Sequence, residues 1–189
     1  MKHRRIGRTL GRNPNHQRAL LKNLASALIL TERAKEDYDE EAMAAKTPGR
    51  IITTQTKAKE LRPYIEKCVT IAVKAQKSID EAASLACKAK RGSDEWRAWR
   101  QGEGWKKWEK AAAPALAARR RALSMLGSRE AVLLLFNVIA PRFVGRPGGY
   151  TRIMTLAKPR LGDAGKRAII EFVGKNDRPK RKAIVPTVE

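Results

Sequence analysis

The sequence predicts an α+β fold in which amphipathic helices accompany a few short strands. Apolar residues recur at helical spacing through long segments, and short β-branched runs lie near turns rich in glycine and proline. A third observation, a strongly cationic N-terminus without acidic residues, predicts a basic arm ahead of the fold. We therefore expect a basic arm over residues 1–13, one α+β domain over residues 14–174 and a flexible basic tail over residues 175–189.

The first 31 residues contain seven cations and no acidic side chain. Gly7, Gly11 and the Asn13-Pro14 pair disfavour a helix over the first dozen residues, so the arm is predicted to be extended. Its natural complement is a polyanion such as a phosphate backbone. An organelle transit peptide is the alternative for such a start, but the capped helix that follows disfavours it.

The first helix is predicted from residue 14 to the low thirties. Asn13 can cap it, and Pro14 suits the first helical position because a missing N–H costs nothing there. Leucines at every fourth position form one apolar face: Leu20, Leu24 and Leu28. Arg18 and Lys22 fall on the other side, so the helix should hold these cations beside the folded body.

The sign of the charge reverses after this helix. Six acidic residues fall within residues 32–41: Glu32, Glu36, Asp37, Asp39, Glu40 and Glu41. The stretch would repel RNA, and we interpret it as a solvated helical extension that faces water or a basic protein neighbour. Residues 51–54 then predict a strand, and residues 57–78 predict a second amphipathic helix with Pro63 as a site for a kink.

All four tryptophans fall between residues 79 and 115, in two i, i+3 pairs: Trp96 with Trp99, and Trp105 with Trp108. Five cations are interleaved with them: Arg97, Arg100, Lys106, Lys107 and Lys110. The rings can stack on unpaired bases, or each pair can form the buried side of a short helical hairpin with the cations outside. The i, i+3 spacing favours the hairpin, because it puts both rings of a pair on one helical face.

The C-terminal third contains the last helix and a β-hairpin. Ser128 can cap a helix whose almost wholly apolar run, residues 132–139, must be buried. Residues 145–149 predict a turn with two positions for positive φ. Residues 150–158 and 167–174 predict the two antiparallel strands of a hairpin.

The composition narrows the class of partner. The chain carries 41 Lys and Arg against 19 Asp and Glu, a formal charge of +22. Such a charge indicates a nucleic-acid partner first and an anionic membrane surface second, with a merely basic soluble protein as the third alternative. No run of about 18 apolar residues is present, so no membrane-spanning helix is expected.

Catalysis and metal binding have little support in the sequence. The two histidines, His3 and His16, lie in the basic N-terminal stretch without a third metal ligand, which favours RNA contacts or a place beside the helix cap over metal binding. Paired carboxylates and phosphate-binding glycine loops are missing. Cys68 and Cys87 lack CxxC spacing and are expected to be reduced structural thiols, although a disulfide between them is not excluded. We expect a binding protein with no enzymatic activity, cofactor, metal or small-molecule substrate.

Three stretches in order carry a family resemblance. The first has Lys2-His3-Arg4-Arg5, Gly7-Arg8, Leu10, Arg12-Asn13, His16, Arg18 and Asn23, and the second has Thr54 and Lys57-Ala58-Lys59-Glu60-Leu61-Arg62. The third, which is the most specific, has Leu135-Phe136-Asn137, Pro141-Arg142-Phe143, Arg146, Gly148-Gly149-Tyr150-Thr151-Arg152-Ile153, Arg160, Gly162-Asp163 and Ile170-Glu171. Together they cover nearly the whole chain, which resembles bacterial large-subunit ribosomal protein seventeen.

The resemblance implies helices packed on a small mixed sheet of three strands. It also implies a structural role in the large (50S) subunit, bound to 23S-type rRNA on the solvent side near the peptide exit region, among other ribosomal proteins. The chain departs from the compact family pattern by two insertions, an acidic one over residues 32–50 and a Trp-rich helical one over residues 75–115, and by the tail. The expected location is the ribosome of a bacterial cytoplasm, and no obligate homo-oligomer or membrane partner is expected.

The candidate RNA-binding residues form two groups. The first belongs to the arm and the first helix: Lys2, His3, Arg4, Arg5, Arg8, Arg12, Asn13, His16, Arg18 and Lys22. The second lies around the Gly148-Gly149 turn and the hairpin loop: Arg142, Arg146, Tyr150, Arg152 and Arg160. Two other functions compete with the ribosomal one. The first is a free architectural nucleic-acid binder, and the second is a small metal-dependent RNA-processing nuclease. The absence of a cluster of acidic residues or histidines from the sequence disfavours the nuclease.

Overall fold

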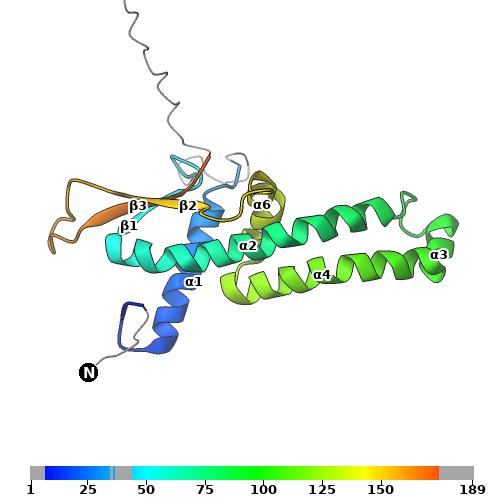
Figure 1. Cartoon of the computed structure of the whole chain (residues 1–189), viewed down its shortest axis with the longest axis horizontal. Coiled ribbons are helices and arrows are strands. Elements are labelled where there is room, and N and C mark those ends of the chain that lie inside the picture. The colour runs from blue at the N-terminus through cyan, green and yellow to red at the C-terminus, as the bar shows by residue number, and fades with distance from the viewer. Residues whose placement is uncertain (1–6, 35, 37–43, 175–189) are drawn as a thin grey trace, which may run out of the picture.

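The computed structural model describes residues 7–34, 36 and 44–174, and it confirms the α+β class (Figure 1). The first six residues of the predicted arm and the whole predicted tail lie outside the described residues. In chain order the elements are α1 (Pro14–Leu30), β1 (Arg50–Thr54), α2 (Gln55–Leu85), α3 (Asp94–Gln101), α4 (Glu103–Leu126), α5 (Arg129–Leu134), the π-helix η3 (Leu135–Ile139), α6 (Ala140–Arg142), β2 (Thr151–Thr155) and β3 (Arg167–Phe172).

The sheet has the strand order β1-β3-β2, and β3 pairs antiparallel with both neighbours. The hairpin of β2 and β3 is therefore confirmed, with strands shorter than predicted. The expectation of a mixed sheet was wrong. Both edge strands run antiparallel to β3. The long helical segment after β1 crosses to the other edge of the sheet, where β2 runs in the same direction as β1.

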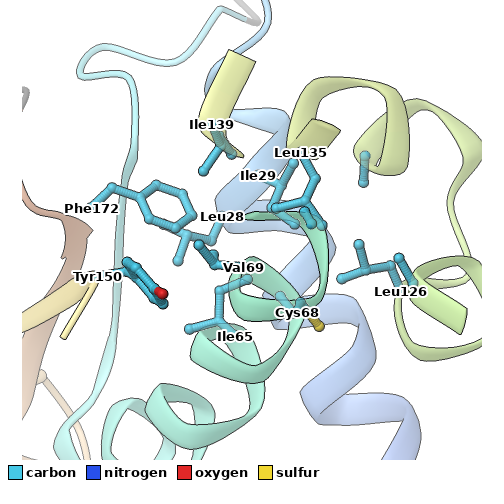
Figure 2. Packing of buried hydrophobic residues seen from close by; sticks show 14 of the residues in the cluster. Leu28, Ile29, Ile65, Cys68, Val69, Leu126, Leu135, Ile139, Tyr150 and Phe172 are labelled. Carbon is cyan, nitrogen blue, oxygen red and sulfur yellow. The ribbon is translucent and has the colours of Figure 1, made fainter. Parts of the chain in front are cut away.

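The core lies between one face of this sheet and α1, α2, η3 and the C-terminal end of α4 (Figure 2). Alternate residues of β3 face the helices, and each is fully buried: Ala168, Ile170 and Phe172. From α2 the buried side chains follow helical spacing: Ala58, Leu61, Ile65, Cys68, Val69 and Ala72. The first half of α2 is thus the central element of the core, and α1 contributes Leu28 and Ile29 beside it.

The predicted cap of α1 is confirmed, since the side chain of Asn13 accepts a 2.8 Å hydrogen bond from the N–H of Asn15. The helix ends at Leu30, so the predicted helical extension does not form over residues 31–34. Glu32 is not solvated either: its side chain is fully buried, and its carboxylate accepts bonds of 3.1 and 2.7 Å from Arg142. Glu32 follows the buried residues Leu28 and Ile29 of α1 at helical spacing. Its place in an acidic stretch led to the wrong expectation that it is solvated. Residues 37–43 of the acidic stretch lie outside the described residues.

The apolar run of residues 132–139 is helical but only partly buried. Ser128 caps α5 as predicted, because its hydroxyl accepts a bond from the N–H of Ala131. Leu133 is 57% exposed and Asn137 is exposed as well, which corrects the expectation that the whole run is buried. The two residues are four apart, so they share the outer face of a helix whose other face fills the core.

The α2 helix continues through Pro63 to Leu85 and packs along α4, and together they form a long antiparallel hairpin with α3 at its outer end (Figure 1). Gly102 is shared by the end of α3 and the start of α4. The rings of three tryptophans contact one another here: Trp99, Trp105 and Trp108. The predicted helical hairpin forms and these three rings contact one another within it, but they are only partly buried, while the interleaved cations are exposed.

Candidate nucleic-acid interface

The described part of the arm, residues 7–13, contains neither helix nor strand and is held against the body by side chains. The side-chain amide of Gln17 donates a 2.5 Å bond to the carbonyl of Gly11. Arg8 lies 3.9 Å from a carboxylate oxygen of Glu60 near the start of α2. The φ of Gly11 is +136°, and a side chain there would meet His16, so glycine permits this close return of the chain.

The arm runs directly into a cationic surface at the start of α1. Arg12, His16 and Arg18 are exposed, and Lys22 is half-buried with its stem against Gly127. The first turn of α1 contains no acidic side chain, so the unpaired N–H groups and the partial positive charge of that end add to the cations. Glu60 contacts Arg8 and can offset the charge of only one cation. The surface formed by Arg8, Arg12, Arg18 and Lys22 therefore keeps an excess of positive charge.

A groove of about 750 Å³ lies between the start of α1, the α2 helix and the C-terminal end of α4. Its walls include Arg18 and Lys22 on one side and Tyr64 with Met125 on the other, and no acidic residue lines it. The hydroxyl of Tyr64 donates a 2.5 Å bond to the carbonyl of Met125, which ties α2 to the end of α4. Burial raises the pKa of Tyr64, with the Cys68 thiol as a second cause, so this hydroxyl stays protonated at neutral pH.

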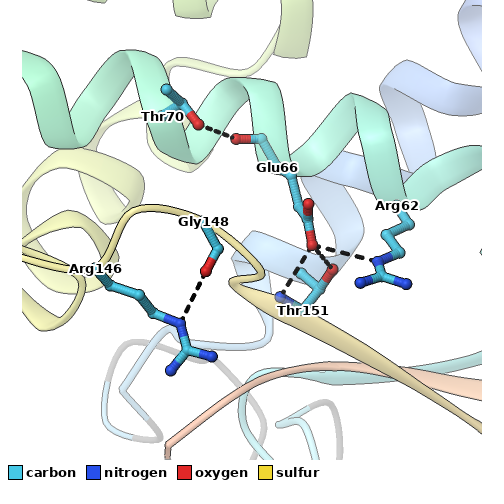
Figure 3. A network of polar contacts seen from close by, with 6 residues as sticks. All are labelled: Arg62, Glu66, Thr70, Arg146, Gly148 and Thr151. Carbon is cyan, nitrogen blue, oxygen red and sulfur yellow. Dashed lines mark hydrogen bonds and ion pairs between the residues drawn. The ribbon is translucent and has the colours of Figure 1, made fainter.

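Part of the second predicted group lies at the turn between α6 and β2, where Figure 3 shows Arg146. Arg146 is exposed, and its Nε donates a 3.0 Å bond to the carbonyl of Gly148. Tyr150 is only 3% exposed, and its hydroxyl donates to the carbonyl of Arg146. Glu66 of α2 fixes the start of β2, because its carboxylate accepts a 2.9 Å bond from the hydroxyl of Thr151. The turn therefore presents Arg146 outward on a support that includes Tyr150.

Arg152 belongs to a charged triad across the three strands. The register places Arg50 of β1, Glu171 of β3 and Arg152 of β2 side by side on the sheet face opposite the helices. Glu171 is fully buried beneath the two arginines, whose Nε atoms lie 2.6 and 2.5 Å from its carboxylate oxygens. The arginine side chains remain 28% and 35% exposed, and two cations face one carboxylate, so the triad still carries net positive charge near the surface.

Arg160 lies in the loop that joins β2 and β3, where it forms a fork-shaped ion pair with Asp163. Hydrogen bonds to the exposed Asp163 carboxylate hold its pKa well below the usual value. The larger contribution comes from Arg160 and the smaller one from the N–H of Gly165. The pair stays charged at neutral pH and shapes the loop. Figure 1 places this loop at the opposite end of the sheet from α6.

The structure thus gathers the first predicted group and spreads the second. Arg8, Arg12, Arg18 and Lys22 surround one end of α1, whereas Lys2, His3, Arg4 and Arg5 lie outside the described residues. Arg142, Arg152 and Arg160 each face a carboxylate, and the loop that contains Arg160 lies at the opposite end of the sheet from α6, which contains Arg142. Sequence reasoning missed the groove wall formed by Tyr64 and the end of α4, since no local pattern signals a contact between segments some 60 residues apart.

Other kinds of site have little support within the described residues. No cluster of three or more metal-ligating side chains occurs among them. Neither Cys68 nor Cys87 forms a disulfide bond. Burial raises the pKa of the Cys68 thiol to about 12, so this cysteine is unreactive at neutral pH. Within the part of the chain that the structure describes, every helix is too short or too polar to cross a membrane.

Comparison with known proteins identifies the family. Residues 20–173 match the family described as Ribosomal protein L17. The chain is 57% identical over 189 residues to the large ribosomal subunit protein bL17 of Rhodopirellula baltica, which covers all of this chain and 89% of the relative. It is 36% identical to the bL17 protein of Nitratidesulfovibrio vulgaris strain Hildenborough, over 91% of this chain and 87% of the relative. It is 35% identical to bL17 of Thermomicrobium roseum, over 92% of this chain and 99% of the relative. The chain belongs to the ribosomal protein L17 family.

Proposed function

We propose that this protein is a structural constituent of the large ribosomal subunit and that it stabilises folded 23S-type rRNA. Family membership supports the ribosomal role. The observation that supports rRNA binding is the acid-free groove at the start of α1, which has Arg18 and Lys22 in its wall and begins where the basic arm ends. The proposal gives the chain no enzymatic role.

The arm and the groove form the primary contact in this proposal. Phosphates of a folded RNA would face Arg8, Arg12 and Arg18, while the glycines of the arm let the backbone approach closely. Lys2, His3, Arg4 and Arg5 extend the same cationic run. Because RNA helices expose phosphates, 2′-hydroxyls and a shallow minor groove, recognition is mainly of shape.

The second group has a more limited role. Arg146 is the member whose guanidinium faces no carboxylate among its described contacts, so we assign it the direct phosphate contact. Tyr150 supports the turn that carries it. Arg152 adds positive potential, because its triad has two cations for one carboxylate, whereas Arg142 and Arg160 are neutralised in one-to-one ion pairs. By resemblance to the family, we place the protein on the solvent side of the subunit near the peptide exit region, in contact with neighbouring ribosomal proteins.

Sedimentation of a tagged copy in a bacterial host tests the proposal. We expect the protein to stay in the large-subunit peak through moderate salt, because many charge contacts act together with shape. The variant Arg18→Gln/Lys22→Gln should leave the peak at lower salt, whereas the matched control Lys74→Gln/Lys77→Gln, on the exposed side of α2, should behave as the parent. Spread of the parent over all nucleic-acid fractions would instead indicate a free, nonspecific binder and contradict the proposal.

A further inference from the structure

The outer end of the α2–α4 hairpin, residues 86–110, is chemically unlike the rest of the molecule. It holds all four tryptophans of the chain, together with eight cations and four acidic residues. We call this segment the hairpin tip. At 1.5 Å per residue the 31-residue α2 is about 45 Å long, so the tip stands far from the arm and the sheet (Figure 1). None of the contacts proposed for the arm and the groove uses it.

Three of the tryptophans hold the tip together. The ring of Trp99 lies 5.5 Å from that of Trp105 in an edge-to-face contact and 6.2 Å from that of Trp108, while Trp105 and Trp108 are 4.9 Å apart. Gly104 makes room for this arrangement, because a side chain there would lie 2.6 Å from the Trp99 ring. All three rings nevertheless remain partly exposed, which a purely structural cluster does not require.

The fourth ring, Trp96, is arranged differently. It is partly exposed like the other three, but the guanidinium carbon of Arg100 lies 5.1 Å from its centroid and 5.1 Å from that of Trp105. These side chains line a hollow of about 390 Å³ whose wall includes all four indoles, Arg91 and Arg100 and no acidic residue. Indole rings beside guanidinium planes provide the surfaces on which unpaired bases stack.

The charge around the hollow completes a polyanion site. Asp94 pairs with Arg97, and Glu103 lies 3.9 Å from Lys107, so two of the four acidic residues are engaged within the tip. Four lysines are exposed beside the indoles and have no ion pair among the described contacts: Lys88, Lys90, Lys106 and Lys110. The tip therefore combines indole stacking surfaces with exposed cations on the same segment.

We propose that the hairpin tip is a second RNA-binding site, which stacks an unpaired base on Trp96 and Arg100 and holds the flanking phosphates with the surrounding lysines. The inference deepens the proposed function, since a protein anchored at both ends of α2 would bridge two separate segments of one RNA. A neighbouring apolar groove along Ile79, Ala112 and Leu116 shares Trp105 and Trp108 with the hollow and includes Glu109. An RNA base suits the hollow better than that groove, because the hollow adds two arginines to its indoles and has no acidic residue in its wall.

Tryptophan fluorescence of the full-length protein reports on this site alone, because the arm and the groove contain no tryptophan. The probe is single-stranded oligo(A) RNA of about 12 nucleotides, a length within the range of known single-strand sites. We expect saturable quenching in the parent and binding at least about fivefold weaker in Trp96→Ala, since that is the smaller effect typical of losing one stacking ring. Trp96→Phe, which keeps an aromatic face, should restore most of the affinity.

Charge is tested with Lys106→Gln/Lys110→Gln against Lys74→Gln/Lys77→Gln, which removes two cations from the same hairpin away from the indoles. Only the first pair should weaken quenching and reduce its salt dependence. Absence of quenching, or equal affinity of the parent and Trp96→Ala with retained helical circular dichroism, would overturn the inference. So would indole emission that changes only when a neighbouring ribosomal protein is added. These results leave the sedimentation test unaffected, so the two proposals fail separately.

Discussion

At the scale of single residues, the most demanding feature is the burial of Glu171. A fully buried carboxylate is tolerated only when cations and hydrogen bonds replace its water, and here Arg50 and Arg152 approach it from the two edge strands. Each arginine alone can still neutralise the carboxylate. The two contributions to stability should therefore not be additive.

We expect Arg50→Met and Arg152→Met each to lower the free energy of unfolding by about 1 kcal/mol, because the remaining arginine keeps Glu171 paired. The double variant leaves the buried carboxylate without either partner and should cost about 3–5 kcal/mol. Urea unfolding at neutral pH measures all three. The excess of the double variant over the sum of the single variants is the signature of a shared partner.

The exposed pair of Arg62 and Glu66 provides the control, since its arginine side chain is 51% exposed. Arg62→Met should change stability by less than about 0.5 kcal/mol. Additive losses in the Arg50 and Arg152 variants would mean that the two guanidinium groups act independently and that the triad is not a unit.

At the scale of elements, the α2–α4 hairpin combines a buried base with an exposed outer half. The base contributes Ala72 from α2 and Ala122 and Leu126 from α4 to the core, all at most 2% exposed. Beyond residue 78 few side chains are buried: Ala82 is 8% exposed and Ala115 is 7% exposed. The outer half therefore adds little to the burial that stabilises the domain.

Replacing residues 79–115 by a short glycine-serine linker should leave the domain folded. Ser78 and Leu116 lie on adjacent, antiparallel helices whose axes pack about 8–10 Å apart, so a few residues can join them. We expect a cooperative urea transition and a midpoint within about 1 M of that of the parent. A variant with Ala122→Asp, which puts a charge in the base, is the control and should lose the transition.

A deletion variant without a cooperative transition would show that the Trp-rich segment is part of the core and not an addition to it. Residual helical circular dichroism alone would not rescue the prediction, because a collapsed state can retain helices.

The sequence predicted most elements and misjudged some of their limits and contacts. Capping residues such as Asn13 and Ser128, together with leucine spacing, predicted where helices begin. The length of α2 was underestimated, since residues 79–85 gain their helical order from packing along α4, a segment far away in the sequence. For the same reason no local pattern could reveal that Glu32 would be buried against Arg142.

At the scale of the whole molecule, composition predicted a polyanion partner but not the distribution of the charge. Net charge and the acid-free start indicated nucleic acid, and the structure places Arg18 and Lys22 in an acid-free groove. The spreading of Arg142, Arg152 and Arg160 among ion pairs depends on strand register and tertiary contacts. Counting cations therefore overestimates the number available to RNA.

The arm should supply most of the salt dependence of rRNA binding. Deleting residues 2–12 removes five cations, and each phosphate that loses its partner lowers the slope of log K against log salt by roughly 0.7–0.9, so the slope should fall by up to about 4. Filter binding to 23S-type rRNA over a salt series measures it. The matched control replaces five exposed cations of α2 and α4 by glutamine: Lys59, Lys67, Lys74, Lys77 and Arg120. Net charge is then equal in both variants, so equal slopes would show that total charge and not the arm drives binding.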